Sequence, residues 1–132
     1  MIENSGLKNQ VICINHINRE KLKDLYRVLD ILTLPSRSEG FPMVVIEAML
    51  SKCCVIRSNT EGAYEQIENG QSGYIFENEN IEQLSQYLNE VVNNEVIRKK
   101  VAKNGQKRAL NLFTDDIMAK NTYNVYKTVL SK

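Results

Sequence analysis

Two glutamates bracket a short segment in which a turn leads into an apolar stretch. Glu39 and Glu47 are separated by seven residues, and Glu47 is the only charged residue within 41–50. Burying that carboxylate without a hydrogen-bonding partner would cost roughly several kcal/mol. The pattern therefore predicts either a polar ligand for Glu47 or a position at the exposed edge of a helix.

The start of the apolar helix should present unpaired backbone amides. Pro42 suits the first helical position, because its missing N–H is not needed there and its φ is already helical. Phe41 would then be the N-cap, and its side chain has no oxygen to accept from the first amides. We expect the amides of Phe41, Met43 and Val44 to stay open at the positive end of the helix, where a phosphate or a polar sugar could bind. Water or an upstream side chain is the alternative partner.

The composition is that of an ordinary globular protein. The 132 residues suffice for one domain with one core, 42% of them are hydrophobic, and the net charge of +1 gives no reason to expect a nucleic acid partner. No apolar stretch reaches the ~20 residues of a membrane span, and the first residues do not form a signal peptide, so we expect a cytoplasmic protein.

The three cysteines are expected to be buried hydrophobic residues in a reducing compartment. Cys53 and Cys54 are adjacent, so they would point to opposite faces of a strand. The sequence contains no zinc-binding spacing and no glycine-rich nucleotide-binding loop of the Rossmann or Walker type.

Strand and helix patterns alternate through the first part of the chain. The predicted strands cover residues 10–14, 30–34, 53–56 and 73–76. The predicted helices between them cover residues 20–29, 42–52 and 63–68. This alternation predicts an α/β fold, a parallel sheet with helices on both faces. Ligands of such sheets bind beyond the carboxyl ends of the strands, where the segment with Glu39 and Glu47 begins.

From residue 80 onward the pattern predicts helices alone. Asn80 should cap the first, the second should cover about 95–112 with a weak point at Gly105, and Thr114 should cap a third helix with one apolar face. We interpret the basic residues of the middle helix as a solvated face rather than a surface for anionic lipid or substrate. The predicted organisation is one partial domain with a poorly defined start at 1–10, an α/β part at 11–78 and a helical part at 79–132.

This ordered set of motifs resembles the C-terminal domain of family 4 (group 1) retaining glycosyltransferases, which have the GT-B fold. The signature Glu-x7-Glu corresponds to Glu39 and Glu47 within the stretch 34–49. Four further segments resemble the helix before this motif, the strand, helix and turn after it, and the junction before the last helix: 23–30, 55–65, 69–73 and 113–115. The resemblance implies a Rossmann-like half of a GT-B fold followed by C-terminal helices.

The resemblance implies a role in donor binding for each matching position. Glu39 would be the catalytic residue and would face the hydroxyls of the donor sugar. The backbone beside it would also contact the sugar, through Gly40, Phe41, Pro42 and Met43. Glycine at position 40 would let the chain approach the sugar closely.

Further along the helix, the amides of Met43 and Val44 would hold the diphosphate of the donor, and Glu47 would accept hydrogen bonds from its ribose. His16 would border the base, although an ordinary loop histidine is the alternative interpretation. Pro42 occupies a position where many members of the family have glycine, which bears on sugar selectivity rather than on phosphate binding. The donor would be a nucleotide-diphosphate sugar such as a UDP- or GDP-sugar, with no metal and no other cofactor.

The implied activity is transfer of a hexose, with retention, to a glycan or lipid acceptor in polysaccharide biosynthesis. We expect the chain to be the later part of a donor-binding domain, because nothing before residue 11 supplies the acceptor domain or the basic loop that neutralises the diphosphate. It should therefore be inactive alone, whether it is truncated or naturally short. Its partners would be the nucleotide sugar and the missing N-terminal domain, with peripheral contact to the inner face of the membrane through the full-length enzyme.

Two other functions remain open from sequence. A non-catalytic nucleotide-sugar-binding module could pair with a separate acceptor-domain polypeptide, and a nucleotide-sugar epimerase could share the GT-B fold. An apolar surface left uncovered by the missing part could also drive self-association.

Overall fold

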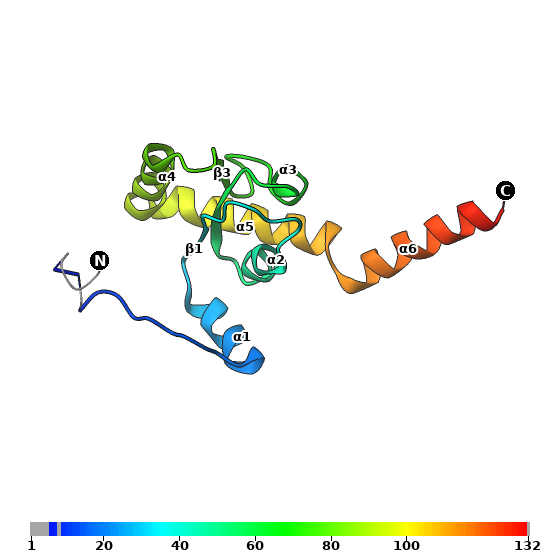
Figure 1. Cartoon of the computed structure of the whole chain (residues 1–132), viewed down its shortest axis with the longest axis horizontal. Helices are drawn as coiled ribbons and strands as arrows, with labels where there is room; N and C mark the ends of the chain where they lie inside the picture. Colours follow the sequence, from blue (N-terminus) through cyan, green and yellow to red (C-terminus); the bar gives the residue numbers. More distant parts are fainter. Residues whose placement is uncertain (1–5, 8, 132) are drawn as a thin grey trace.

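A parallel three-stranded sheet with the order β1-β2-β3 lies at the centre of the fold (Figure 1). The strands are β1 (Ile31–Leu34), β2 (Cys54–Ser58) and β3 (Tyr74–Phe76). The structure, a computed structural model, describes residues 6–7 and 9–131. All three strands end at the same edge of the sheet, so the loops that follow them gather there.

Six helices formed by the described residues surround and extend this sheet. They are α1 (Arg19–Val28), α2 (Met43–Leu50), α3 (Ala63–Gln66), α4 (Ile81–Asn93), α5 (Glu95–Leu112) and α6 (Asp115–Leu130). One buried cluster joins α1, α2 and α3 to one face of the sheet, and a second joins α4 to the other face, with α5 contributing to both. The expected α/β fold, a parallel sheet covered on both faces, is confirmed.

The strand predicted at 10–14 is wrong. These residues form no strand, and Ile12 is 88% exposed. A strand is stable only with a hydrogen-bonded neighbour, and none of the described residues pairs with β1 on the side away from β2. For the same reason β1 is an edge strand that is only partly buried, whereas every residue of β2 is buried.

The predicted caps Asn80 and Thr114 are confirmed, whereas two predicted features of the later helices are wrong. The Asn80 side chain accepts from the amide of Gln83 at 3.0 Å, and the Thr114 hydroxyl accepts from the amide of Ile117 at 3.4 Å. Gly105 does not weaken α5. The helix is continuous there, and the missing side chain lets it pack closely, since a Cβ would lie 2.8 Å from the carbonyl oxygen of Ser72.

The interpretation of the basic helix as a solvated face is wrong for two of its arginines. Arg108 donates to the carbonyl oxygens of Glu65 and Gln66 and to the carboxylate of Glu68. Arg98 donates to the carbonyl oxygen of Val91 at 2.7 Å. Both side chains therefore connect elements of the fold, because their long stems reach past the helix surface.

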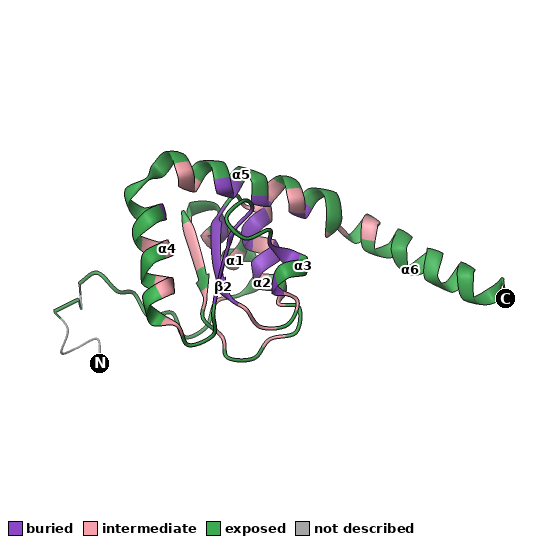
Figure 2. Ribbon diagram, turned by 90° about the horizontal axis from the view of Figure 1, so that it is seen from above, coloured by how far each residue is buried: buried purple, intermediate pink, exposed green. Residues whose placement is uncertain are grey.

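Helix α6 projects away from the rest of the molecule (Figure 2), and none of its residues is buried. The apolar face expected for this helix is uncovered in the described structure, with Met118, Val125, Tyr126 and Val129 each more than 60% exposed. None of the described helices has both the length and the apolar character that crossing a bilayer requires.

The cysteines give a simple test of the core. Cys53 and Cys54 are buried in clusters on opposite faces of the sheet, as predicted, whereas Cys13 is exposed and the prediction that it is buried is wrong. Burial raises the pKa of Cys53 to about 11 and that of Cys54 to about 12. We expect a thiol reagent at neutral pH to label one cysteine quickly in the folded protein and three after denaturation.

Replacing Cys13 with serine should abolish the fast labelling and leave the two slow thiols unchanged. Fast labelling of a second cysteine in the native protein would contradict the packing of β2.

Candidate functional site

The loop 35–42 joins the end of β1 to the start of α2, at the edge of the sheet where the strands end. Pro42 is the N-cap of α2, with φ −66° and ψ 120°, and Met43 is the first helical residue. The prediction that Phe41 is the N-cap is therefore wrong by one residue, because Pro42 keeps an extended ψ. The consequence for the amides is unchanged, since proline has no side-chain acceptor either.

Most amides at the start of α2 have no hydrogen-bond acceptor in the described structure. The amide of Val45 donates to the carbonyl oxygen of Pro42 at 3.3 Å. Within the described chain, the amides of Phe41, Met43 and Val44 have no acceptor. Three backbone donors thus remain at the positive end of a helix, a suitable place for an anion.

Gly40 in this loop and Gly62 before α3 lie next to each other, but they differ in the space around their Cβ positions. A Cβ at Gly40 would have nothing within 4 Å, so the fold does not require glycine there and the space above it is open. Gly62 has φ +71°, and a Cβ on it would lie 2.5 Å from the carbonyl oxygen of Gly40. The loop before α3 therefore supports the Gly40 segment from inside the molecule.

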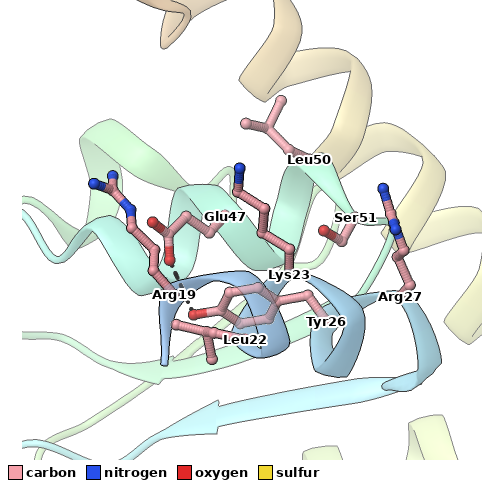
Figure 3. Close-up of a pocket in the computed structure, with 8 residues that line it drawn as sticks. All are labelled: Arg19, Leu22, Lys23, Tyr26, Arg27, Glu47, Leu50 and Ser51. Atoms are coloured by element: carbon pink, nitrogen blue, oxygen red, sulfur yellow. Dashed lines mark hydrogen bonds between the residues drawn. The ribbon is translucent and has the colours of Figure 1, made fainter. Parts of the chain in front are cut away.

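Glu47 lies in a pocket of about 450 Å³ between α1 and α2 (Figure 3). The pocket is lined by Arg19, Leu22, Lys23, Tyr26, Arg27, Glu47, Leu50 and Ser51. The Tyr26 hydroxyl donates to the Glu47 carboxylate at 3.0 Å, and the pKa of Tyr26 is raised to about 12 by burial and by this carboxylate. Tyr26 thus remains a neutral donor at physiological pH.

The lining of this pocket carries three cationic side chains and a single carboxylate. Glu47 is half-buried and accepts one protein hydrogen bond in the described structure, so it retains capacity for further donors. The pocket can therefore take a ligand that combines negative charge with hydroxyl groups. Sequence analysis identified Glu47 but missed Tyr26 as its partner, because the two residues come from different helices.

Glu39 is half-buried in the loop, and its carboxylate accepts no hydrogen bond within the described chain. Beneath the loop, near the end of β2, lies Arg57, which is completely buried. Burial lowers the pKa of Arg57, and the carboxylates of Glu39 and Glu65 act against this through space. Sequence analysis missed Arg57, although a charged residue within an otherwise apolar strand is a signal comparable to Glu47 in its helix.

The remaining candidates differ in how they relate to the loop. The ring of Phe41 contacts Phe113 edge-to-face, with centroids 5.6 Å apart, and so connects the loop to the end of α5. His16 is exposed in the segment before α1 and does not line the pocket that contains Glu47. Among the described residues, no group of three or more His, Cys, Asp or Glu side chains could hold a metal ion.

Comparison with known proteins identifies related sequences over most of the chain. Residues 1–108 match the family described as "Glycosyl transferases group 1". The chain is 29% identical over 122 residues to the capsular polysaccharide biosynthesis glycosyltransferase CapM of Staphylococcus aureus, covering 92% of this chain and 32% of that protein. It is 31% identical over 112 residues to N,N'-diacetylbacillosaminyl-diphospho-undecaprenol alpha-1,3-N-acetylgalactosaminyltransferase of Campylobacter jejuni, covering 85% of this chain and 30% of the relative. The chain therefore spans about a third of the length of these curated relatives.

Solved structures agree with this match. The C-terminal domain of the group 1 glycosyl transferase LpcC from Francisella tularensis superposes with a TM-score of 0.80 at 30% identity, over 86% of this chain and 59% of that one. The HepE protein of Anabaena, solved in complex with UDP-glucose, gives a TM-score of 0.83 over 99% of this chain and 35% of HepE. At 24% identity, the similarity to HepE concerns the fold alone.

Proposed function

The chain belongs to the glycosyl transferases group 1 family, and from this premise we propose that it is the donor-binding part of a glycosyltransferase. Its ligand would be a nucleotide-diphosphate sugar. The reaction would transfer a hexose, with retention, to a glycan or lipid acceptor during polysaccharide biosynthesis. The observation that carries this proposal is the pair of sites on α2, with open amides at its start and Glu47 in a cation-lined pocket along its side.

The start of α2 would bind the diphosphate. The amides of Met43 and Val44 are donors without an acceptor in the described chain, and the helix dipole favours negative charge at this end. The open space at Gly40 would let the donor sugar contact the backbone of the loop. Glu39, whose carboxylate has no hydrogen bond in the described structure, would then face the sugar hydroxyls.

The pocket beside α2 would bind the nucleoside. Glu47 would accept hydrogen bonds from the ribose hydroxyls, and such charge-assisted bonds contribute about 1.5–3 kcal/mol each. In the view of Figure 3 the Arg19 and Lys23 side chains of α1 lie on either side of this carboxylate, and they would add positive charge near the phosphates. His16 lies three residues before the first residue of α1 and stays a candidate contact for the base.

We propose that turnover needs an acceptor-binding domain in addition to these residues. The site described here contains groups that bind a donor, whereas attack on the anomeric carbon also needs a positioned acceptor hydroxyl. The 132-residue chain alone should therefore release no nucleoside diphosphate in step with glycosylation of an acceptor. The absence of a resident metal stays a prediction.

An NMR titration of the labelled chain tests the donor site. UDP, GDP and their glucose or mannose conjugates should shift the amides of residues 40–47 and the pocket side of α1, and one base should bind more tightly than the other. We expect dissociation constants of about 0.1–1 mM, equivalent to roughly 4–5.5 kcal/mol, because helix amides and three exposed cations form a partial site. Shifts confined to α6, or none at millimolar ligand, would contradict the proposal.

A further inference from the structure

A buried guanidinium lies directly beneath the loop that starts α2. Arg57 donates to four acceptors, all of them uncharged: the carbonyl oxygen of Ser58 at 3.2 Å, the side-chain oxygen of Gln66, the Thr60 hydroxyl at 2.7 Å and the carbonyl oxygen of Glu61 at 3.2 Å. A cation buried without an ion pair is costly, and an apolar side chain of similar size would fill the space with less penalty. Filling space in the core therefore does not explain why an arginine is buried at this position.

Gln66 connects Arg57 to Pro42, the N-cap of α2, through hydrogen bonds. Its side chain is completely buried, and its amide nitrogen donates to the carbonyl oxygen of Pro42 at 3.0 Å. A guanidinium has only donors, so the oxygen of the Gln66 amide must face Arg57 and its nitrogen must face Pro42. The network thus has a single orientation, running from Arg57 through Gln66 to Pro42.

The orientation of the Pro42 carbonyl fixes the direction of the next amide. Across a trans peptide the C=O and the N–H point in opposite directions. The Pro42 carbonyl is held by the side chain of Gln66 at 3.0 Å and, more weakly, by the amide of Val45 at 3.3 Å. The amide of Met43 in the same peptide must therefore point away from Gln66. Hydrogen bonds that start from a charged donor are stronger than neutral ones, so Arg57 strengthens this restraint.

Arg57 also restrains the turn before α3, which packs against the loop. Its bonds to Thr60 and Glu61 restrain the turn that leads to Gly62, which in turn packs against the carbonyl of Gly40. One side chain therefore acts on both ends of the segment 40–43. None of its four hydrogen bonds goes to this segment, so Arg57 acts through Gln66 and through the turn.

We propose that Arg57 and Gln66 are positioning residues that hold the Pro42–Met43 peptide with its amide facing the diphosphate of the donor. The identity of that ligand rests on the proposed function. The orientation and rigidity of the Met43 amide do not, and they can be measured without ligand.

Substitution of Gln66 by glutamate separates positioning from packing. In Gln66→Glu the carboxylate still accepts from Arg57, but it has no N–H for Pro42. We expect the folded protein to keep or raise its Tm, while the backbone order parameter of Met43 falls from about 0.85 to below about 0.6 and UDP affinity falls about tenfold. Gln66→Met, which removes both bonds, should give the same loss at Met43 together with a lower Tm.

Arg57→Met and the matched control Ile56→Val complete the series. Ile56 neighbours Arg57 on β2, is equally buried and has no bond to the loop, so its variant should leave the Met43 amide unchanged. In the double variant Arg57→Met, Gln66→Met, the loss of UDP affinity should be smaller than the product of the two single losses, because both act through one peptide.

The two readouts decide separate questions. An unchanged Met43 order parameter in Gln66→Glu and Gln66→Met overturns the inference, whatever the ligand results. If the wild-type chain binds neither UDP nor GDP, the proposed function fails. A loss of order at Met43 would still support the positioning of the peptide.

Discussion

Replacing Glu47 with glutamine is expected to weaken binding of UDP or GDP about 10- to 100-fold. The change keeps the size of the side chain but would turn the proposed charge-assisted hydrogen bonds from the ribose hydroxyls into neutral ones. That difference is about 1 kcal/mol or slightly more per bond, and two hydroxyls give roughly 1.4–2.8 kcal/mol. Isothermal calorimetry or NMR titration of both proteins measures it directly.

The selectivity of the loss identifies the role of Glu47. Inorganic pyrophosphate has no ribose, so its affinity for Glu47→Gln should be unchanged or slightly higher, because the pocket loses its carboxylate and keeps Arg19, Lys23 and Arg27. Equal losses for pyrophosphate and UDP would argue against a ribose contact.

Tyr26 provides the matched control. Its hydroxyl donates to Glu47 at 3.0 Å, so part of any effect at Glu47 could come from loss of this packing contact. Tyr26→Phe removes the hydroxyl and leaves the carboxylate charged. We expect it to change UDP affinity by less than about threefold, since Glu47 then has one more free acceptor site for the ligand. A loss as large as that of Glu47→Gln would assign the effect to the helix contact.

Local patterns predicted the elements that carry this site. The proline at position 42 and the capping residues Asn80 and Thr114 act within one turn of the chain, so sequence alone placed the helices within a few residues. The position of Glu47 in an apolar helix likewise identified it as unusual. The burial of Glu47 and its hydrogen bond with Tyr26 could not be predicted from the sequence, because they depend on α1, which packs against α2 only in the folded chain.

Non-local relations account for what the sequence did not reveal. Residues 10–14 have the composition of a strand, but composition does not tell whether a neighbouring strand is available to pair with them. Up to 24 residues separate Arg57, Gln66 and Pro42 in the sequence. The hydrogen bonds that connect them form only because β2 ends beneath the loop. Hydrogen bonds between elements of this kind leave no periodic signal in the sequence.

The second large effect is expected at Gly62. Alanine there should lower the free energy of unfolding by roughly 2–5 kcal/mol. About 1–2 kcal/mol comes from a Cβ at φ +71° and a further 1–3 kcal/mol from its overlap with the carbonyl oxygen of Gly40. For a domain of this size we expect Tm to fall by roughly 8–20 °C. Thermal unfolding followed by circular dichroism measures the change.

Two other glycines separate the causes of this loss. Gly70 has φ +75° but a Cβ there would have nothing within 4 Å, so Gly70→Ala should show the backbone penalty alone. Gly40 has neither a positive φ nor a neighbour near its Cβ, so Gly40→Ala should leave Tm nearly unchanged and weaken binding of a UDP- or GDP-sugar at least fivefold.

The contrast between these variants links stability to the site. If Gly62→Ala is no less stable than Gly70→Ala, the turn before α3 does not press against the loop, and the support inferred for Gly40 is wrong. If Gly40→Ala binds the donor as well as the wild-type chain, the open space above this residue is not where the sugar lies. Gly62 packs against the carbonyl group of Gly40, so the methyl group of Gly62→Ala tests the packing of the fold. The methyl group of Gly40→Ala extends into open space and therefore tests the binding of the donor.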